Sequence, residues 1–128
     1  MKNSTIILIH SDEYANWVFD PNHPTQGRRF TLAKERLLDL SPESGVVVVE
    51  IDSNYLPPLA QLESVHEHLY IEDLLVNGRC GEWEGERLDL ASLAARMAGG
   101  TMLAARKLLT GNALTAVNFA GAKHHAMA

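Results

Sequence analysis

The sequence predicts an α/β fold in which a parallel sheet lies between helices on both of its faces, giving three layers. Two short runs rich in β-branched residues, 4–10 (STIILIH) and 45–52 (GVVVVEID), are typical of strands that are covered on both sides. A third run of this kind, ALTAVNFA, spans residues 113–120. Segments with apolar residues at helical spacing separate the three runs. Strands that alternate with helices favour a parallel sheet.

The first half of the chain provides a loop and a helix between the first two strands. Residues 11–27 are expected to form a loop, because two prolines, a glycine and several Asn and Asp residues interrupt every period. A helix should follow from Arg28 to Ser41. Pro42 should end it, since the residue before a proline disfavours the helical conformation.

The second half is expected to contain two helical segments. One covers residues 60–78 and ends at Asn77-Gly78. The apolar residues that should face inward along it are Leu62, Val65, Leu69 and Leu74. Residues 79–89 should form an exposed loop or a small hairpin.

A longer helix should run from Leu90 to about Leu108 and contain the pair Gly99-Gly100 in its middle. Each glycine inside a helix costs roughly 1 kcal/mol relative to alanine. The pair therefore predicts a close helix crossing at which only small residues fit.

Composition limits the function classes. A chain of 128 residues predicts a single domain over residues 1–128, and 46% hydrophobic with 21% charged residues is ordinary for a globular protein. The net charge of −5 argues against binding to nucleic acid. The one cysteine, Cys80, excludes an internal disulfide and a multi-cysteine zinc site. No signal peptide and no apolar run long enough to cross a membrane are visible, so we expect a cytoplasmic protein without membrane contact.

The adjacent histidines His124 and His125 are the main candidates for chemistry. They follow the last predicted strand, and ligands of parallel sheets gather beyond the carboxyl ends of the strands. Two converging imidazoles can divide acid and base duties near neutral pH. The alternative is a surface pair or a remnant of a tag. His66 and His68 are two residues apart, so on a helix their side chains diverge by about 200° and cannot share a metal. We expect one of them to pack against the fold and the other to be solvated.

Two basic residues at the start of the first helix, Arg28 and Arg29, are unfavourable to its dipole. At least one of them should therefore have a tertiary partner. His23 is expected to be a turn element of the preceding loop. No phosphate-binding loop, dinucleotide motif or nucleophile elbow is present.

Four motifs in order resemble those of the histone deacetylase superfamily, particularly its acetoin-utilisation and acetylpolyamine amidohydrolase-like branches. They are HPTQGRR (23–29), LESVHEHLYI (62–71) with His66 and Tyr70, MAGGTMLAA (97–105) and NFAGAKHHAMA (118–128). The resemblance covers nearly the whole chain from about His10 onward. It implies the N-terminal part of an arginase/deacetylase-like fold.

The resemblance also implies residue roles. In this family a zinc-bound water attacks an amide carbonyl and releases acetate and an amine. His125 would be the general base and acid, and His124 its electrostatic neighbour. The residues of the substrate or acetate channel would be Arg29, Gly121, Tyr14 and His23.

Two departures from the family pattern qualify these roles. Ala122 stands where the family has a second glycine. The family's zinc ligands, an Asp-x-His pair and a later Asp, and its oxyanion-stabilising tyrosine follow the His-His turn, and the sequence contains none of them. A catalytic zinc needs at least three protein ligands. We therefore expect an N-terminal fragment or truncated relative of a zinc-dependent deacetylase that holds no zinc and is inactive alone.

Other interpretations remain at this point. The chain could be a standalone non-catalytic protein that binds a small acyl compound or a protein partner, or an unrelated α/β protein. In each case an incomplete parallel sheet leaves an unpaired edge and an uncovered apolar surface. We therefore expect a homo-oligomer, and a small acetylated substrate only in a full-length parent.

Overall fold

The computed structural model describes residues 4–18, 20–53, 55–111 and 113–121. In this part of the chain β1 (Ser4–His10), β2 (Val46–Asp52) and β3 (Thr115–Asn118) form a parallel sheet in the order β2-β1-β3. The register pairs Ile6 with Val48 on one side and with Thr115 on the other. The predicted α/β fold with a parallel sheet is confirmed.

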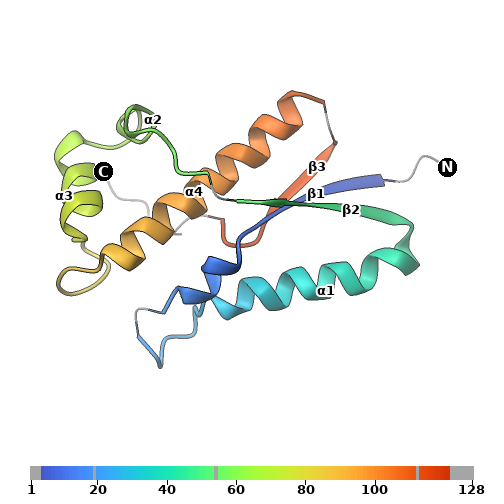
Figure 1. Ribbon diagram of the computed structural model, residues 1–128, viewed down its shortest axis with the longest axis horizontal. Coiled ribbons are helices and arrows are strands. Elements are labelled where there is room, and N and C mark those ends of the chain that lie inside the picture. The colour runs from blue at the N-terminus through green and yellow to red at the C-terminus, as the bar shows by residue number, and fades with distance from the viewer. Residues whose placement is uncertain (1–3, 19, 54, 112, 122–128) are drawn as a thin grey trace.

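Helices cover both faces of the sheet (Figure 1). Helix α1 (Arg28–Ser44) packs on β2 and β1, and α4 (Leu88–Leu109) packs on β1 and β3 from the opposite face. Two shorter helices, α2 (Leu59–Glu63) and α3 (His68–Asn77), lie between β2 and α4 in the sequence. A 3-10 helix, η1 (Asp12–Asn16), follows β1 and contacts α1. No helix in the described ranges is long and apolar enough to span a membrane.

The central strand β1 is the most buried part of the sheet. Ile7 and Ile9 pack with Ala104 of α4 in one core cluster. Successive side chains of a strand point to opposite faces, so Leu8 and His10 lie on the α1 side. A second cluster joins η1 to the first half of α4, and its buried members are Tyr14, Trp17, Leu90, Leu93 and Met97.

Helix α1 extends past the expected stop at Ser41 and includes Pro42. A proline inside a helix has no N–H to donate to the carbonyl four residues earlier, which is that of Leu38. The Ser41 hydroxyl donates to this carbonyl oxygen instead, at 3.1 Å. The helix ends at Gly45, whose φ of 69° is left-handed.

The single helical segment expected over residues 60–78 is wrong, because α2 and α3 are separate helices. Glu67 has an extended backbone (ψ 140°) and separates them. The break changes which residues face inward: Val65 and Leu69 are 76% and 73% exposed, whereas Ile71 is buried. The predicted end at Asn77-Gly78 is confirmed, and Cys80 and Trp83 form an antiparallel bridge in the small hairpin that follows.

The glycine pair in α4 allows a close approach, as predicted, but the element opposite Gly99 is the segment between β2 and α2 and not the expected helix. A Cβ atom on Gly99 would collide with the carbonyl oxygen of Tyr55 and the ring of Pro57. Gly100 is equally enclosed by side chains from other elements, which the candidate site below includes.

Candidate functional site

The carboxyl ends of the strands meet at one edge of the sheet, near the middle of the molecule where α4 crosses (Figure 1). His10 ends β1, Asn118 ends β3, and Ser53 directly follows β2. The Ser53 N–H donates to the carbonyl oxygen of His10 at 2.8 Å, which continues the ladder past the last paired residues. This is the edge at which parallel α/β sheets bind ligands.

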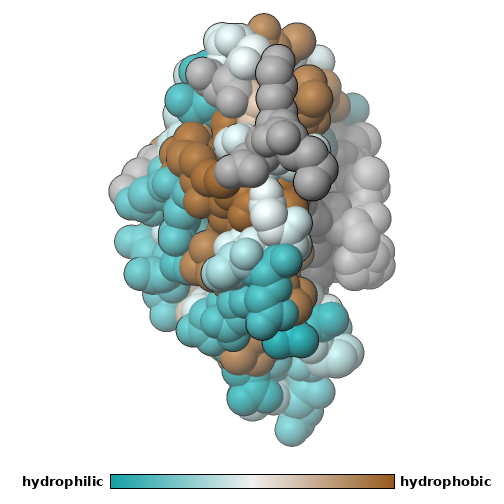
Figure 2. Space-filling view, turned by 90° about the vertical axis from the view of Figure 1, so that its right-hand side faces the viewer, coloured by the Kyte–Doolittle hydropathy of each residue, from teal (hydrophilic) through white to brown (hydrophobic). Residues whose placement is uncertain are grey.

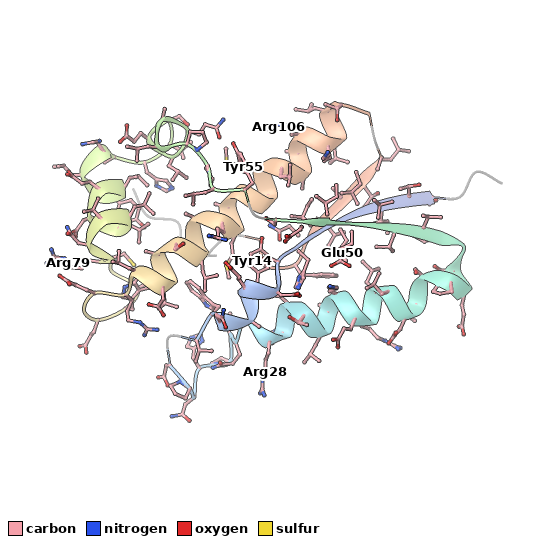
Figure 3. The ribbon with its side chains drawn as sticks, viewed as in Figure 1. Tyr14, Arg28, Glu50, Tyr55, Arg79 and Arg106 are labelled. Carbon is pink, nitrogen blue, oxygen red and sulfur yellow. The ribbon has the colours of Figure 1, made fainter. Side chains whose placement is uncertain are left out.

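Three polar side chains, two from these strand ends and one from η1, surround Gly100. An added Cβ on Gly100 would lie 2.7 Å from Asn118 Nδ2, 2.7 Å from Tyr14 Oη and 3.0 Å from Ser53 Oγ. Figure 3 shows Tyr14 between η1 and α4, at the centre of the molecule. We name Tyr14, Ser53 and Asn118 the Gly100 cluster. Glycine is required here because any side chain would displace these groups.

Asn118 fixes the turn after β3. Its side-chain amide donates to the carbonyl oxygen of Met97 at 3.0 Å and to Thr101 Oγ1 at 3.2 Å. The backbone carbonyl oxygen of Asn118 accepts from the N–H of Gly121 at 3.0 Å, and Gly121 has a φ of 57°. The turn that precedes His124 and His125 in the sequence is therefore anchored to the middle of α4.

The Gly100 cluster contains hydrogen-bonding capacity that the described part of the chain leaves unused. Tyr14 Oη, Ser53 Oγ and Asn118 Oδ1 are buried, and none of them has a well-formed hydrogen bond there. Burial raises the pKa of the Tyr14 phenol, while the neighbouring Ser53 hydroxyl acts in the opposite direction. Tyr14 thus stays protonated at neutral pH. Buried polar groups normally have a partner, so these three atoms can still hydrogen-bond a further polar group.

His10 lines a cavity of about 380 Å³ on the α1 side of the same edge. The lining residues are His10, Ser11, Asp12, Glu13, Glu50 and Asp52. Burial lowers the pKa of His10, and Lys34 lowers it further, although Asp12, with Oδ1 3.5 Å from Nε2, favours the charged form. The imidazole is consequently neutral at pH 7.

Two of the cavity's carboxylates already have cationic partners. Lys34 Nζ lies 2.5 Å from Glu50, and Arg96 Nη1 lies 2.8 Å from Glu13. The negative charge of the cavity is therefore partly neutralised. Among the described residues, no group of three or more His, Cys, Asp or Glu could hold a metal ion.

The predicted site residues fall into separate places. Tyr14 joins the Gly100 cluster, and Gly121 is linked to it through Asn118. His23 and Arg29 lie in and next to the loop before α1: His23 Nδ1 accepts from the Thr25 N–H at 3.0 Å, as expected of a turn element. His124 and His125 lie outside the described residues.

The arginine pair at the start of α1 is exposed. The Arg29 guanidinium donates to the carbonyl oxygen of Pro24 at 3.3 Å, a contact within the same loop rather than across the fold. Arg28 points away from the sheet (Figure 3). Arg29 therefore contacts the turn that precedes α1 and not the edge of the sheet.

His66 and His68 separate as expected. The His66 ring packs on Tyr70, with centroids 5.4 Å apart, and its Nδ1 is buried. His68 is exposed and lies 2.6 Å from Glu63 Oε1, which raises the pKa of its imidazole. These two histidines do not form a common site.

Sequence reasoning did not single out His10 or Ser53 as site residues, and it used Asn118 only as the start of a motif. The signal available was positional, because each follows or ends a predicted strand. The cluster itself depends on the packing of α4 across the sheet edge, which no local pattern encodes.

Comparison with known proteins shows that the chain is distantly similar to one characterised protein. No protein-family model matches the chain. The chain is similar to the acetoin utilization protein AcuC of Bacillus subtilis (strain 168), with 29% identity over 136 residues that cover 93% of this chain. The chain spans about a third of that relative's length. The resemblance that the motifs predict is thus confirmed as a distant similarity to AcuC, a protein of the histone deacetylase family.

Proposed function

We propose that this chain forms part of an amide hydrolase of the histone deacetylase family that releases acetate from N-acetylated amines. The observation that carries the proposal is the anchoring of Asn118 to Met97 and Thr101 beside Gly100. It joins two of the family-like motifs at the carboxyl edge of the sheet. The similarity to AcuC supports the same assignment.

Amide hydrolysis needs a base that takes a proton from water and an acid that gives one to the leaving amine. We assign both roles to His125, with His124 as its electrostatic neighbour. The anchored turn at Asn118 and Gly121 would limit the positions that these histidines reach. A fixed geometry of this kind is what proton transfer in a site requires.

The Gly100 cluster and Gly121 are proposed to receive the acetate. His23 and Arg29, which the resemblance assigns to the same channel, lie instead in the loop before α1 and at the start of α1. Tyr14 is protonated and buried, and its hydroxyl lacks a well-formed hydrogen bond among the described residues. Such a hydroxyl can donate to a carboxylate oxygen. Ser53 offers a second hydroxyl at the same place.

Zinc supplies the family with a water of lowered pKa and polarises the amide carbonyl. The described part of this chain does not fit a zinc site by itself, because it has no group of three potential ligands. The chain spans about a third of its relative. We therefore propose that the metal ligands of an active hydrolase come from a polypeptide segment other than the described residues.

A chimera tests the proposed function. This chain would replace the matching segment of AcuC, and hydrolysis of an acetyl-lysine peptide and an N-acetylated diamine would be measured with the zinc-loaded protein. We expect turnover, with a loss of at least about a hundredfold in His125→Ala, in line with general acid–base catalysis. His68→Ala, on the exposed His68, is the matched control and should leave turnover unchanged.

Two results would contradict the function. One is a folded, zinc-loaded chimera that hydrolyses neither substrate while AcuC itself does. The other is turnover that His125→Ala does not reduce.

A further inference from the structure

The polar side chains of the Gly100 cluster gather at the carboxyl edge of the sheet. Tyr14 lies in η1 and Ser53 directly follows β2, and the relative exposure of each residue is 0%. Figure 2 looks onto the opposite end, where the strands begin, and shows hydrophobic side chains in its upper and middle part with hydrophilic ones below over α1. The two buried hydroxyls therefore lie at the edge where parallel sheets bind polar ligands.

Both residues are held in place by their neighbours. The Tyr14 ring packs edge-on against the rings of His10 and Phe30, with centroids 5.7 and 6.3 Å apart. The Ser53 N–H donates to the carbonyl oxygen of His10 at 2.8 Å. A Cβ atom on Gly100 would lie 2.7 Å from Tyr14 Oη and 3.0 Å from Ser53 Oγ, so the two hydroxyl oxygens converge there. Packing among β1, η1, α1 and α4 thus sets their arrangement.

The hydrogen-bond inventory of the cluster gives the two hydroxyls different roles. The side-chain amide of Asn118 donates to Met97 and Thr101, so its two hydrogens are committed and its Oδ1 can only accept. A carboxylate also only accepts, which leaves the hydroxyls of Tyr14 and Ser53 as the side-chain donors of the cluster. A phenol is a stronger acid than an alcohol and donates more strongly to an anion. Tyr14 is therefore the preferred donor to acetate.

The electrostatic surroundings of Tyr14 agree with a donor at its oxygen. Burial raises the pKa of the Tyr14 phenol and the Asp52 charge adds to this, whereas the Ser53 hydroxyl and the Arg96 charge lower it. A hydroxyl lowers the pKa of a phenol when it donates to the phenol oxygen, because it then stabilises the ionised form. A phenol that accepts such a bond is also a better donor, since hydrogen bonds in a chain polarise one another.

We propose that Ser53 is a positioning residue for acetate and acts through Tyr14. Neither hydroxyl has a well-formed hydrogen bond among the described residues, so both hydrogens can reorient when a ligand arrives. The Ser53 hydroxyl then donates to Tyr14 Oη, and the phenol hydrogen turns to the acetate oxygen. Ser53 itself does not contact acetate. The inference rests on the proposed function, which supplies acetate as the ligand.

Titration of the phenol in this chain tests the contact without any hydrolysis. Ultraviolet absorbance would follow Tyr14 as the difference between each variant and the same variant carrying Tyr14→Phe, and circular dichroism would restrict the comparison to folded protein. We expect Ser53→Ala to ionise only at higher pH than the wild type, because the phenolate loses a donor. Ser53→Thr, which keeps the hydroxyl, should titrate like the wild type, as should the control Ser92→Ala on the exposed face of α4. An unchanged titration in Ser53→Ala would overturn the proposal.

Inhibition of the chimera by acetate separates an indirect role of Ser53 from a direct one. Tyr14→Phe should weaken this inhibition about tenfold and Ser53→Ala about threefold, which is the range of a single hydrogen bond. Because Ser53 acts through Tyr14, Ser53→Ala should have no further effect in a Tyr14→Phe background. Additive losses would show that Ser53 contacts acetate itself and would also overturn the proposal. A chimera without turnover contradicts the proposed function alone, since the titration still decides whether Ser53 donates to Tyr14.

Discussion

The side-chain amide of Asn118 donates to the carbonyl oxygen of Met97 at 3.0 Å and thereby ties the end of β3 to the middle of α4. The contact explains why two motifs separated in the sequence, 97–105 and 118–128, belong together. Gly100 leaves the space in which the Asn118 amide lies, and Thr101 offers its hydroxyl oxygen as a second acceptor. The close packing at Gly100 and the anchored turn after β3 are one structural unit.

Asn118→Ala should lower the free energy of unfolding by about 1–3 kcal/mol, because the Met97 and Thr101 contacts are lost and their partners stay partly buried. Urea unfolding would measure the loss. Asn22→Ala, in the exposed loop before α1, is the control and should stay within about 0.5 kcal/mol of the wild type. Equal stability of the two variants would show that the Asn118 amide does not anchor the turn.

Gly100→Ala should also destabilise the protein, although alanine is the better helix former by about 1 kcal/mol. The added Cβ would lie 2.7 Å from both Tyr14 Oη and Asn118 Nδ2. Overpacking of this kind costs about 1–3 kcal/mol. The same substitution in an Asn118→Ala background should cost less, since one of the displaced groups is absent, and a double-mutant cycle of urea midpoints measures the difference. Strict additivity would contradict the contact.

The acid side of the stability profile should depend on His10. Its pKa is lowered in the folded state, mainly by burial, so between that pKa and about 6.5 the unfolded chain binds more protons. The stability is therefore present above pH 6.5 and is lost as the pH falls through this window. We expect His10→Gln to lose less stability than the wild type between pH 7 and about 5.

His68 provides the comparison of opposite sign. Glu63 raises its pKa, so its contribution is full below about pH 6.5 and is lost as the pH rises through the folded-state pKa. His68→Gln should consequently lose more stability than the wild type on acidification. Chemical unfolding at a series of pH values measures both variants, and parallel profiles for the two would refute the assignment.

Much of the fold could be predicted from local patterns. The β-branched runs of β1 and β2 predicted both strands. Burial on both faces is observed for β1, whereas no residue of β2 is buried and Val47 and Val49 are 43% and 44% exposed. Gly99-Gly100 predicted a close approach because glycine has a cost in a helix. The end of α1 was mispredicted because the Ser41 hydroxyl takes over the carbonyl of Leu38 that Pro42 cannot serve. This compensation depends on the rotamer of the Ser41 side chain. The general preference of helices to end before a proline does not take it into account.

The candidate site was less accessible to sequence reasoning. Tyr14 was named through the family resemblance, and its burial among η1, α1 and α4 arises only when these elements pack. Ser53 has no local signal, since an exposed loop serine would look the same in the sequence. The break at Glu67 also escaped prediction, and it turned Val65 and Leu69 outward.

The chain alone should bind no catalytic zinc and hydrolyse no acetylated amine. A catalytic zinc needs at least three protein ligands in one place, and the described histidines are dispersed: His10 ends β1, His23 is in a loop, and His66 packs on Tyr70 while His68 lies against Glu63. Calorimetric titration with zinc, combined with an acetyl-lysine hydrolysis assay, tests this. We expect only weak binding without fixed stoichiometry, and no turnover above buffer. Tight binding of one zinc per chain, or turnover abolished by His125→Ala, would show that residues of this chain complete the metal site.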